Sequence, residues 1–173
     1  VYTLQQPITI AGEERHEIGI KHYGYDPTLA PAGKSVVEVM FTSNYDYWAE
    51  LREGDEGEER YDAEKKDVAI KVIDQLERRY PGITGQIEVT DVATPLTYAR
   101  YTGNWQGSME GWLITTDNMR TKMKKTLPDL EGFRMCGQWV EPGGGVPTAA
   151  ASGRQAIADI CKADGREFVT TTV

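Results

Sequence analysis

Residues that bind metals or build disulfide frameworks are scarce in this sequence. Its 173 residues include two cysteines and two histidines. Cys136 and Cys161 neighbour neither each other nor a histidine, so we expect no metal site, no disulfide scaffold and a reduced, cytoplasmic setting. His16 and His22 lie in strand-like stretches without a serine or cysteine motif beside them. We interpret both as surface or packing residues rather than catalytic bases.

Positive charge and long apolar runs are also lacking. The chain has 19 lysines and arginines against 27 aspartates and glutamates, a formal net charge of −8. Nucleic acid and anionic membranes repel such a chain at long range, so we expect no nucleic-acid partner. No stretch approaches the roughly 20 apolar residues of a membrane-spanning helix, and no signal peptide is visible. Peripheral contact with a membrane stays an open alternative, although the net negative charge adds no electrostatic attraction to it.

The first third of the sequence contains strand patterns. Near-period-two alternation predicts strands over residues 2–10, 16–25 and 34–43, and residues 43–51 favour a short helix. The acidic run at residues 53–59 lacks the ligand spacing of a calcium loop, so we interpret it as a solvated loop.

Helical signals dominate the middle of the chain. Apolar residues at helical spacing predict a helix over residues 61–80, with Asp62 as its N-cap and the Pro81-Gly82 pair as its end. A strand is predicted over residues 86–92. Thr94 followed by a proline then indicates the start of another short helix.

Three elements are expected in the last part of the chain. Short strands are predicted at residues 111–116 and 132–137, and a helix at residues 147–162. The expected buried residues of this helix are Ala150, Ile157, Ile160 and Cys161. Strands, a long helix, further strands and a closing helix predict an α+β fold, with a mixed, largely antiparallel sheet and flanking helices.

A glycine-rich stretch, "GQWVEPGGGVPTAAASGRQA" at residues 137–156, stands directly before that closing helix. A helix N-terminus presents backbone N–H groups and a positive dipole end, which suit an anion or an electron-rich ring. The stretch does not complete the dinucleotide fingerprint G-x-G-x-x-G, because Thr148 stands at the third glycine position and the turn is too long. Taken alone, it is typical of a flexible surface loop.

A second phosphate motif is also incomplete. The sequence "PAGKS" at residues 31–35 matches the end of a P-loop, but Thr28 occupies the place of its first glycine. Prolines at positions 27 and 31 remove two of the backbone N–H donors that a P-loop uses to bind phosphate. We interpret the segment as a structural turn.

Several segments together resemble one family of flavoproteins. They are "DPTLAPAGKSVVEV" at residues 26–39, "ERRYPGITGQIEVTDVATPLTYARYTGNWQGSMEGW" at 77–112 and "GFRMCGQWVEPGGGVPTAAASGRQAI" at 132–157. Their order and patterns are similar to the carboxy-terminal part of the phytoene desaturase, carotenoid isomerase and retinol saturase branch of the amine-oxidase-like FAD oxidoreductases. The resemblance implies a substrate-domain-like region at residues 1–131. Residues 132–173 would be a strand, glycine loop and helix that complete an FAD-binding domain.

The resemblance also implies a set of cofactor contacts. Gly137 and Gln138 correspond to a pair beside the ribityl and phosphate portion of FAD, although the family often has aspartate where this chain has Gln138. Gly144, Gly145 and Val146 correspond to the loop over the flavin. Pro147 and Thr148 correspond to the helix start that faces its N1 and C2 carbonyl edge. The implied FAD-binding residues are Gly137, Gln138, Gly143, Gly144, Gly145, Val146, Pro147 and Thr148. No residue is assigned a catalytic role, because much of the chemistry belongs to the flavin.

The family's G-x-G-x-x-G unit appears nowhere in the sequence, and the sequence begins with Val1 in a strand-like stretch. We therefore expect a carboxy-terminal fragment whose partner is a missing amino-terminal FAD-binding domain, and which is inactive alone. The whole enzyme would desaturate, saturate or isomerise an apolar polyene of carotenoid or retinoid kind. Two alternatives stay open: a non-catalytic carrier of prenylated proteins with the same architecture, and an unrelated α+β binding domain whose glycine loop is only a loop.

Overall fold

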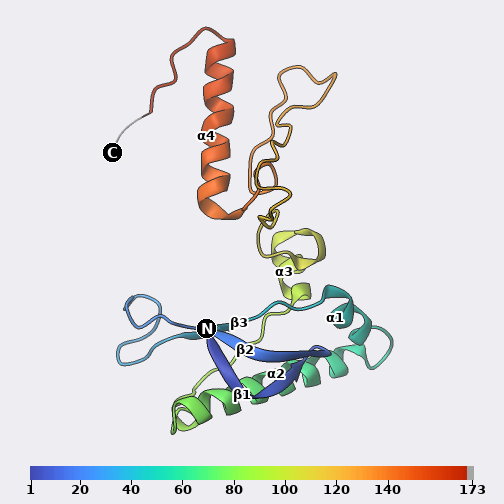
Figure 1. Cartoon of the computed structure of the whole chain (residues 1–173), viewed down its shortest axis with the longest axis vertical. Helices are drawn as coiled ribbons and strands as arrows, with labels where there is room; N and C mark the ends of the chain where they lie inside the picture. The colour runs from blue at the N-terminus through green and yellow to red at the C-terminus, as the bar shows by residue number, and fades with distance from the viewer. Residues whose placement is uncertain (171–173) are drawn as a thin grey trace. The chain divides into compact units, whose positions relative to one another are not determined.

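The computed structural model describes residues 1–170 and separates into two compact units (Figure 1). The first unit comprises Val1–Gly107 and the second Ser108–Val173. The functional division predicted between residues 131 and 132 is a different boundary and stays a prediction.

The first unit contains an antiparallel sheet in the order β1-β2-β3. Its strands are β1 (Tyr2–Ile10), β2 (Glu13–His22) and β3 (Val37–Met40). All three predicted strands are confirmed. Ala11 and Gly12, with φ of 49° and 76°, form the tight turn between β1 and β2. Both pairings in the described residues are antiparallel, so the expected parallel component of the sheet is absent there.

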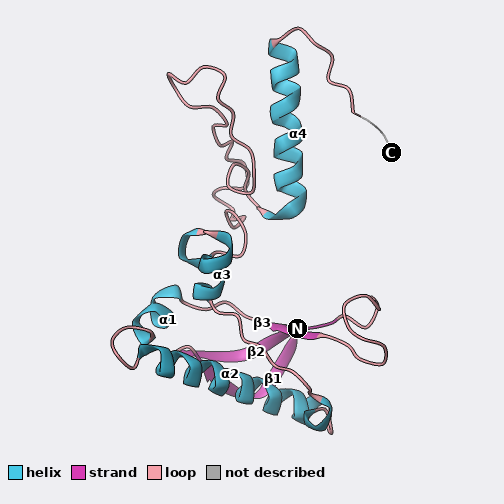
Figure 2. Ribbon diagram, turned by 180° about the vertical axis from the view of Figure 1, so that it is seen from behind, coloured by secondary structure: helices cyan, strands magenta, loops and turns pink. Residues whose placement is uncertain are grey.

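A long helix covers one face of this sheet. Figure 2 shows α2 (Gly57–Arg79) running along β1 and β2, and α1 (Tyr45–Leu51) stands just before it. The core consists of Ile10, Ala11, Trp48, Tyr61 and Val68. Tyr61 and Val68 are the side chains that α2 contributes to this core, with Val72 packed against it.

The start of α2 differs from the prediction. The helix begins at Gly57, so Asp62 lies inside it and is not the N-cap, and part of the predicted acidic loop is helical. Glu58 and Glu59 in the first turn stabilise the positive end of the helix dipole. A Cβ at position 57 would lie 2.0 Å from the carbonyl oxygen of Arg52, so only glycine allows this approach. The helix ends at Arg79, before Pro81, as predicted.

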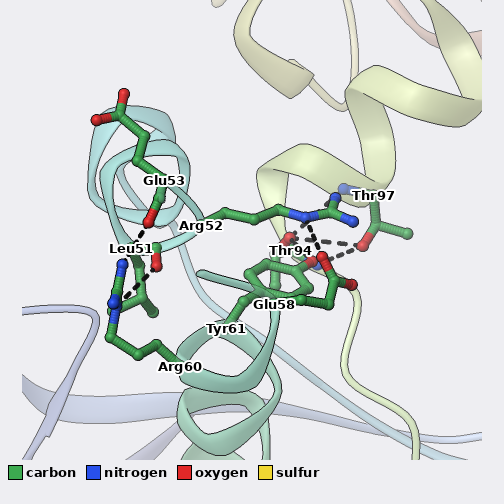
Figure 3. A network of polar contacts seen from close by, with 8 residues as sticks. All are labelled: Leu51, Arg52, Glu53, Glu58, Arg60, Tyr61, Thr94 and Thr97. Atoms are coloured by element: carbon green, nitrogen blue, oxygen red, sulfur yellow. Dashed lines mark hydrogen bonds and ion pairs between the residues drawn. The ribbon is translucent and has the colours of Figure 1, made fainter. Parts of the chain in front are cut away.

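A polar network joins α2 to α3 (Pro95–Thr102) (Figure 3). The Tyr61 hydroxyl lies 2.7 Å from the buried Oγ1 of Thr94. Thr94 caps α3 through a capping box with Thr97, which confirms the predicted helix start. Arg52 lies over the Tyr61 ring, 5.2 Å from its centroid, and pairs with Glu58 at 2.6 Å.

Residues 87–94 form no strand, so the strand predicted over 86–92 is wrong. The 3₁₀ helices η1 (Thr84–Gln86) and η2 (Trp105–Gly107) flank this segment and α3. A β-favourable sequence forms a strand only where a neighbour offers a ladder, and no described strand pairs with this segment. The "PAGKS" segment lies in the irregular connection between β2 and β3, consistent with a structural turn.

The second unit consists of irregular chain followed by α4 (Gly145–Ala163). The strands predicted at residues 111–116 and 132–137 are absent for the same reason. Its backbone bonds are scattered: the Met135 nitrogen donates to the Lys125 oxygen at 2.7 Å.

The closing helix is confirmed, but its predicted buried face is wrong. Within α4 the buried residues are Ser152 and Ala156, whereas Ile157 is 52 % and Ile160 38 % exposed. Ala150 is also exposed, and Cys161 is half-buried. Contacts with the preceding loop, rather than apolar character, decide which side of α4 is covered in this unit.

Candidate cofactor site

The glycine run before α4 has a backbone that favours glycine at each position. Gly143, Gly144 and Gly145 have φ of 98°, 49° and 75°, and Gly137 at the start of the loop has φ of 119°. Residues with a Cβ rarely adopt such angles. The three consecutive glycines therefore provide a sharply folded loop rather than a merely flexible one.

This loop lies directly on the segment around Gly111. A Cβ at position 111 would lie 1.9 Å from the Gln138 oxygen, and one at position 144 would lie 2.4 Å from the Gly111 nitrogen. The Gly143 nitrogen donates to the Trp112 oxygen at 2.8 Å. Backbone meets backbone at both glycines, which explains why neither position can carry a side chain.

Two tryptophans hold the same pair of segments together. The indole Nε1 of Trp112 donates to the Trp139 oxygen at 3.0 Å. Their rings meet edge to face, with centroids 5.4 Å apart and an interplanar angle of 86°. Trp112 is 48 % exposed, so it holds one side of the loop rather than filling a core.

Ser152 anchors the loop from the other side. It is 1 % exposed, and its hydroxyl donates to the Ala149 oxygen at 2.7 Å. The same Oγ accepts from the Gly137 nitrogen at 2.8 Å. Sequence reasoning missed this residue, because a serine inside a run of small residues carries no motif. The signal available was its mid-helix position, where serine often bonds back to the preceding turn.

The first turn of α4 is open. No side chain caps the helix at Gly144, and the first N–H groups of any helix have no partner within it. Val146 is 82 % exposed, Pro147 is exposed, and Thr148 is half-buried. The helix end can therefore offer N–H groups to a ligand.

Acidic charge already lies near this helix end. The Cβ position of Gly145 is 3.6 Å from Oε1 of Glu110. A Cβ at position 143 would face Ile114, and one at position 144 would face Gly111. A ligand would therefore reach the first turn of α4 along the helix axis, past residues 145–148, rather than across the glycine run.

All eight predicted FAD-binding residues fall on one loop and one helix start. They lie within residues 137–148 of the second unit, between the tryptophan clamp and Ser152. The uncapped N–H groups of the first turn of α4 fit an electron-rich ring, which would have to lie clear of the Glu110 carboxylate next to Gly145. The Gly137 nitrogen is not available to a phosphate, because it already donates to Ser152.

A cavity of about 420 Å³ borders the loop on the side of Pro142. It lies within the second unit. Its lining residues are Ile114, Met119, Arg120, Thr121, Lys122, Glu141 and Pro142. Sequence reasoning missed it, because residues 114–122 and 141–142 converge only in the fold.

The other chemistry-bearing groups are placed as surface or structural residues. His16 and His22 are exposed, as expected, and His22 Nε2 lies 2.9 Å from the Ser35 hydroxyl. Cys136 and Cys161 are both free. Across residues 1–170 no group of three or more His, Cys, Asp or Glu side chains is arranged to hold a metal, and no helix there is long and apolar enough to cross a membrane.

The shifted pKa values lie in the first unit and have structural causes. The pKa of Glu77 is lowered by backbone N–H groups of Gly82 and Thr84, with which the carboxylate closes the turn after α2. Burial raises the pKa of Tyr47, and Glu64 adds to this shift. Neither group belongs to the glycine loop, so these shifts give no acid–base pair there.

Curated proteins similar to this chain include two enzymes named as isomerases. The chloroplastic prolycopene isomerase of Arabidopsis thaliana is 31 % identical over 129 residues, which cover 74 % of this chain and 21 % of that protein. The chloroplastic prolycopene isomerase of Daucus carota is 29 % identical over 129 residues, covering 74 % of this chain and 20 % of that protein.

A third relative is named as an oxidoreductase-domain protein. Pyridine nucleotide-disulfide oxidoreductase domain-containing protein 2 of Rattus norvegicus is 32 % identical over 133 residues, covering 72 % of this chain and 21 % of that protein. No protein-family model matches the chain, and no solved structure does. The chain is thus related over part of its length to proteins named as a prolycopene isomerase and an oxidoreductase-domain protein, and it spans about one fifth of the length of these relatives.

Proposed function

We propose that this chain is part of an FAD-dependent oxidoreductase or isomerase that acts on a long apolar polyene of carotenoid or retinoid kind. The open first turn of α4, presented by a glycine loop fixed on both sides, carries the proposal. The similarity to proteins named as a prolycopene isomerase and an oxidoreductase-domain protein supports it.

The proposed role of α4 is electrostatic. Bound flavin would accept or donate hydride in a redox reaction, and reduced flavin would support isomerisation. The reduced ring carries negative charge near N1 and O2. Backbone N–H groups at the start of α4 and the helix dipole stabilise negative charge at that edge. Exposure of Val146 and Pro147 leaves this turn accessible.

Two further residues have proposed supporting roles. Gln138, half-buried in the loop, has an amide that can bond a ribityl hydroxyl without adding charge. Ser152 keeps the start of the loop against α4, so that the loop and the helix end move as one piece.

The remainder of the flavin site must come from residues outside this chain. No G-x-G-x-x-G unit occurs among the 173 residues, and the Gly137 nitrogen is occupied. We therefore propose an amino-terminal FAD-binding domain as the structural partner. The 173-residue chain alone should bind FAD weakly and be inactive.

The test is flavin content and turnover of the full-length protein. We expect the purified protein to show the visible absorbance of bound flavin, and to convert a carotenoid or retinoid when its product is separated by chromatography. The isolated 173-residue chain serves as the control and should be colourless. A full-length protein that stays colourless after incubation with FAD would contradict the proposal.

A further inference from the structure

The cavity beside the glycine loop has an unbalanced charge. Of the residues that line it, Arg120 and Lys122 are cationic and Glu141 is anionic. Glu141 pairs with Lys125 from outside the lining set. Neither Arg120 nor Lys122 forms an ion pair or hydrogen bond in the described part of the chain. Two positive charges at the cavity are therefore uncompensated.

This local charge is unusual in the chain as a whole. The formal net charge is −8, yet residues 118–127 contain four cations and no carboxylate. At physiological salt, charges further away than about 8 Å are largely screened. A small anion at the cavity mouth therefore experiences the local positive charge more than the distant negative charge.

The remaining lining residues are the apolar Ile114, Met119 and Pro142 and the polar Thr121, and the cavity is open to solvent. Ile114 is 57 % and Met119 62 % exposed, and Pro142 closes the side next to the glycines. Leu113, which precedes this wall, is 80 % exposed. Apolar side chains beside unpaired cations suit a molecule with an apolar body and an anionic end.

The cavity is continuous with the loop of the proposed flavin site. The Cδ1 atom of Ile114 lies 2.9 Å from the Cβ position of Gly143. A molecule on Ile114 and Pro142 therefore extends towards the glycine loop and the start of α4. An amphipathic ligand could hold its anionic end at Arg120 and Lys122 with its apolar part near the loop.

We infer that this cavity binds the carboxylate of an amphipathic apolar acid, through Arg120 and Lys122, beside Ile114, Met119 and Pro142. Arginine has a planar fork of donors that matches a carboxylate, and lysine adds a point charge. The identification of this acid as the substrate rests on the proposed function. On that basis the substrate is a polyene acid rather than a neutral polyene.

A matched pair of ligands tests the inference. All-trans-retinoate and all-trans-retinol share one polyene and differ at the end group. Binding to the full-length protein is followed by quenching of tryptophan fluorescence, to which Trp112 and Trp139 contribute. We expect retinoate to bind roughly tenfold more tightly than retinol, which is what two partly exposed cations can supply. The preference should fall as salt rises from about 20 mM to about 500 mM.

Matched variants locate the effect. Arg120→Gln with Lys122→Gln should weaken retinoate binding roughly tenfold and leave retinol binding unchanged. The control is Lys162→Gln with Arg166→Gln, which removes the same charge near the far end of α4, about 25 Å along the helix. The control should keep the preference for retinoate.

Two results would overturn the inference: equal affinity for both ligands in the wild type, or the same preference in the cavity variant and the wild type. Flavin absorbance, recorded on the same samples, separates this failure from failure of the proposed function. A flavin-loaded protein without the preference contradicts the acid site alone. A colourless protein that retains the preference contradicts the flavin proposal and its substrate assignment, while the binding site stands.

Discussion

The Oγ of Ser152 accepts a hydrogen bond from the backbone nitrogen of Gly137, 15 residues earlier, at 2.8 Å. This bond ties the first residue of the glycine loop to the second turn of α4. On the opposite side, Trp112 holds Trp139 through a 3.0 Å bond. The loop is therefore shaped by contacts remote in sequence, and its start and its helix are linked.

Removing the Ser152 hydroxyl should loosen the loop. In Ser152→Ala the Gly137 N–H loses its partner, which we expect to cost about 1–3 kcal/mol and to weaken flavin binding. Urea denaturation and flavin titration of the full-length protein measure the two effects. Ser35→Ala is the control, because Ser35 is exposed and its hydroxyl bonds, among residues 1–170, to exposed His22 alone. Equal behaviour of the two variants would count against the anchoring role.

Gly144→Ala should be more disruptive than Gly165→Ala. Both glycines have positive φ, 49° and 63°, but Gly144 also has a ψ of −156°, in a region that is essentially restricted to glycine, so its variant carries the larger backbone cost. A Cβ at position 144 also lies 2.4 Å from the Gly111 nitrogen, whereas one at position 165 meets nothing within 4 Å. Displacement of the loop should add about 1–3 kcal/mol at position 144. Thermal unfolding measures the difference, and equal midpoint temperatures for the two variants would contradict this packing argument.

The buried hydroxyl pair of the first unit gives a third prediction. Tyr61→Phe removes the 2.7 Å bond to Thr94, a residue that is 2 % exposed, and should lower the free energy of unfolding by about 1–2 kcal/mol. Tyr101→Phe, at a side chain that is 76 % exposed, should change it by less than about 0.5 kcal/mol. Urea denaturation distinguishes them, and a neutral Tyr61→Phe variant would show that the bond contributes nothing.

The stabilising contribution of Glu77 to the first unit should be lost in acid. Its pKa is lowered in the folded protein, chiefly by the backbone N–H groups of Gly82 and Thr84. A lowered folded-state pKa stabilises the fold above the unfolded pKa of 4.5, and this contribution is lost as pH falls through the folded-state pKa. The stability gap between wild type and Glu77→Gln should therefore narrow between about pH 6 and pH 3. Glu17→Gln serves as the control, and a pH-independent gap for Glu77→Gln would argue against the linkage.

Local signals explain the parts of the fold that sequence predicted. Period-two alternation identified β1 to β3, apolar spacing identified α2, and the pair of Thr94 and Pro95 identified the start of α3. These features depend on a residue and its near neighbours. The strands predicted at residues 86–92, 111–116 and 132–137 failed because a strand also needs a partner, which local pattern does not contain.

The candidate site divides in the same way. The glycine run and the helix start were visible in sequence, since glycine and the small residues after it are a local pattern. Gly111, Trp112 and Ser152 were not, because their importance lies in contacts with residues 137–144. The exposed Ile157 likewise looked like a core residue, since apolar character does not show which face of a helix is covered.

The most direct test of the central claim is flavin binding by Gly145→Asp in the full-length protein. This variant adds a second carboxylate, beside that of Glu110, to the first turn of α4, where the proposed flavin edge carries negative charge. Gly165→Asp, at a glycine with a φ of 63° beyond the other end of α4, is the control. We predict that Gly145→Asp raises the dissociation constant of FAD at least about tenfold while Gly165→Asp leaves it unchanged. Equal flavin affinity in the two variants and the wild type would contradict a flavin at this helix end.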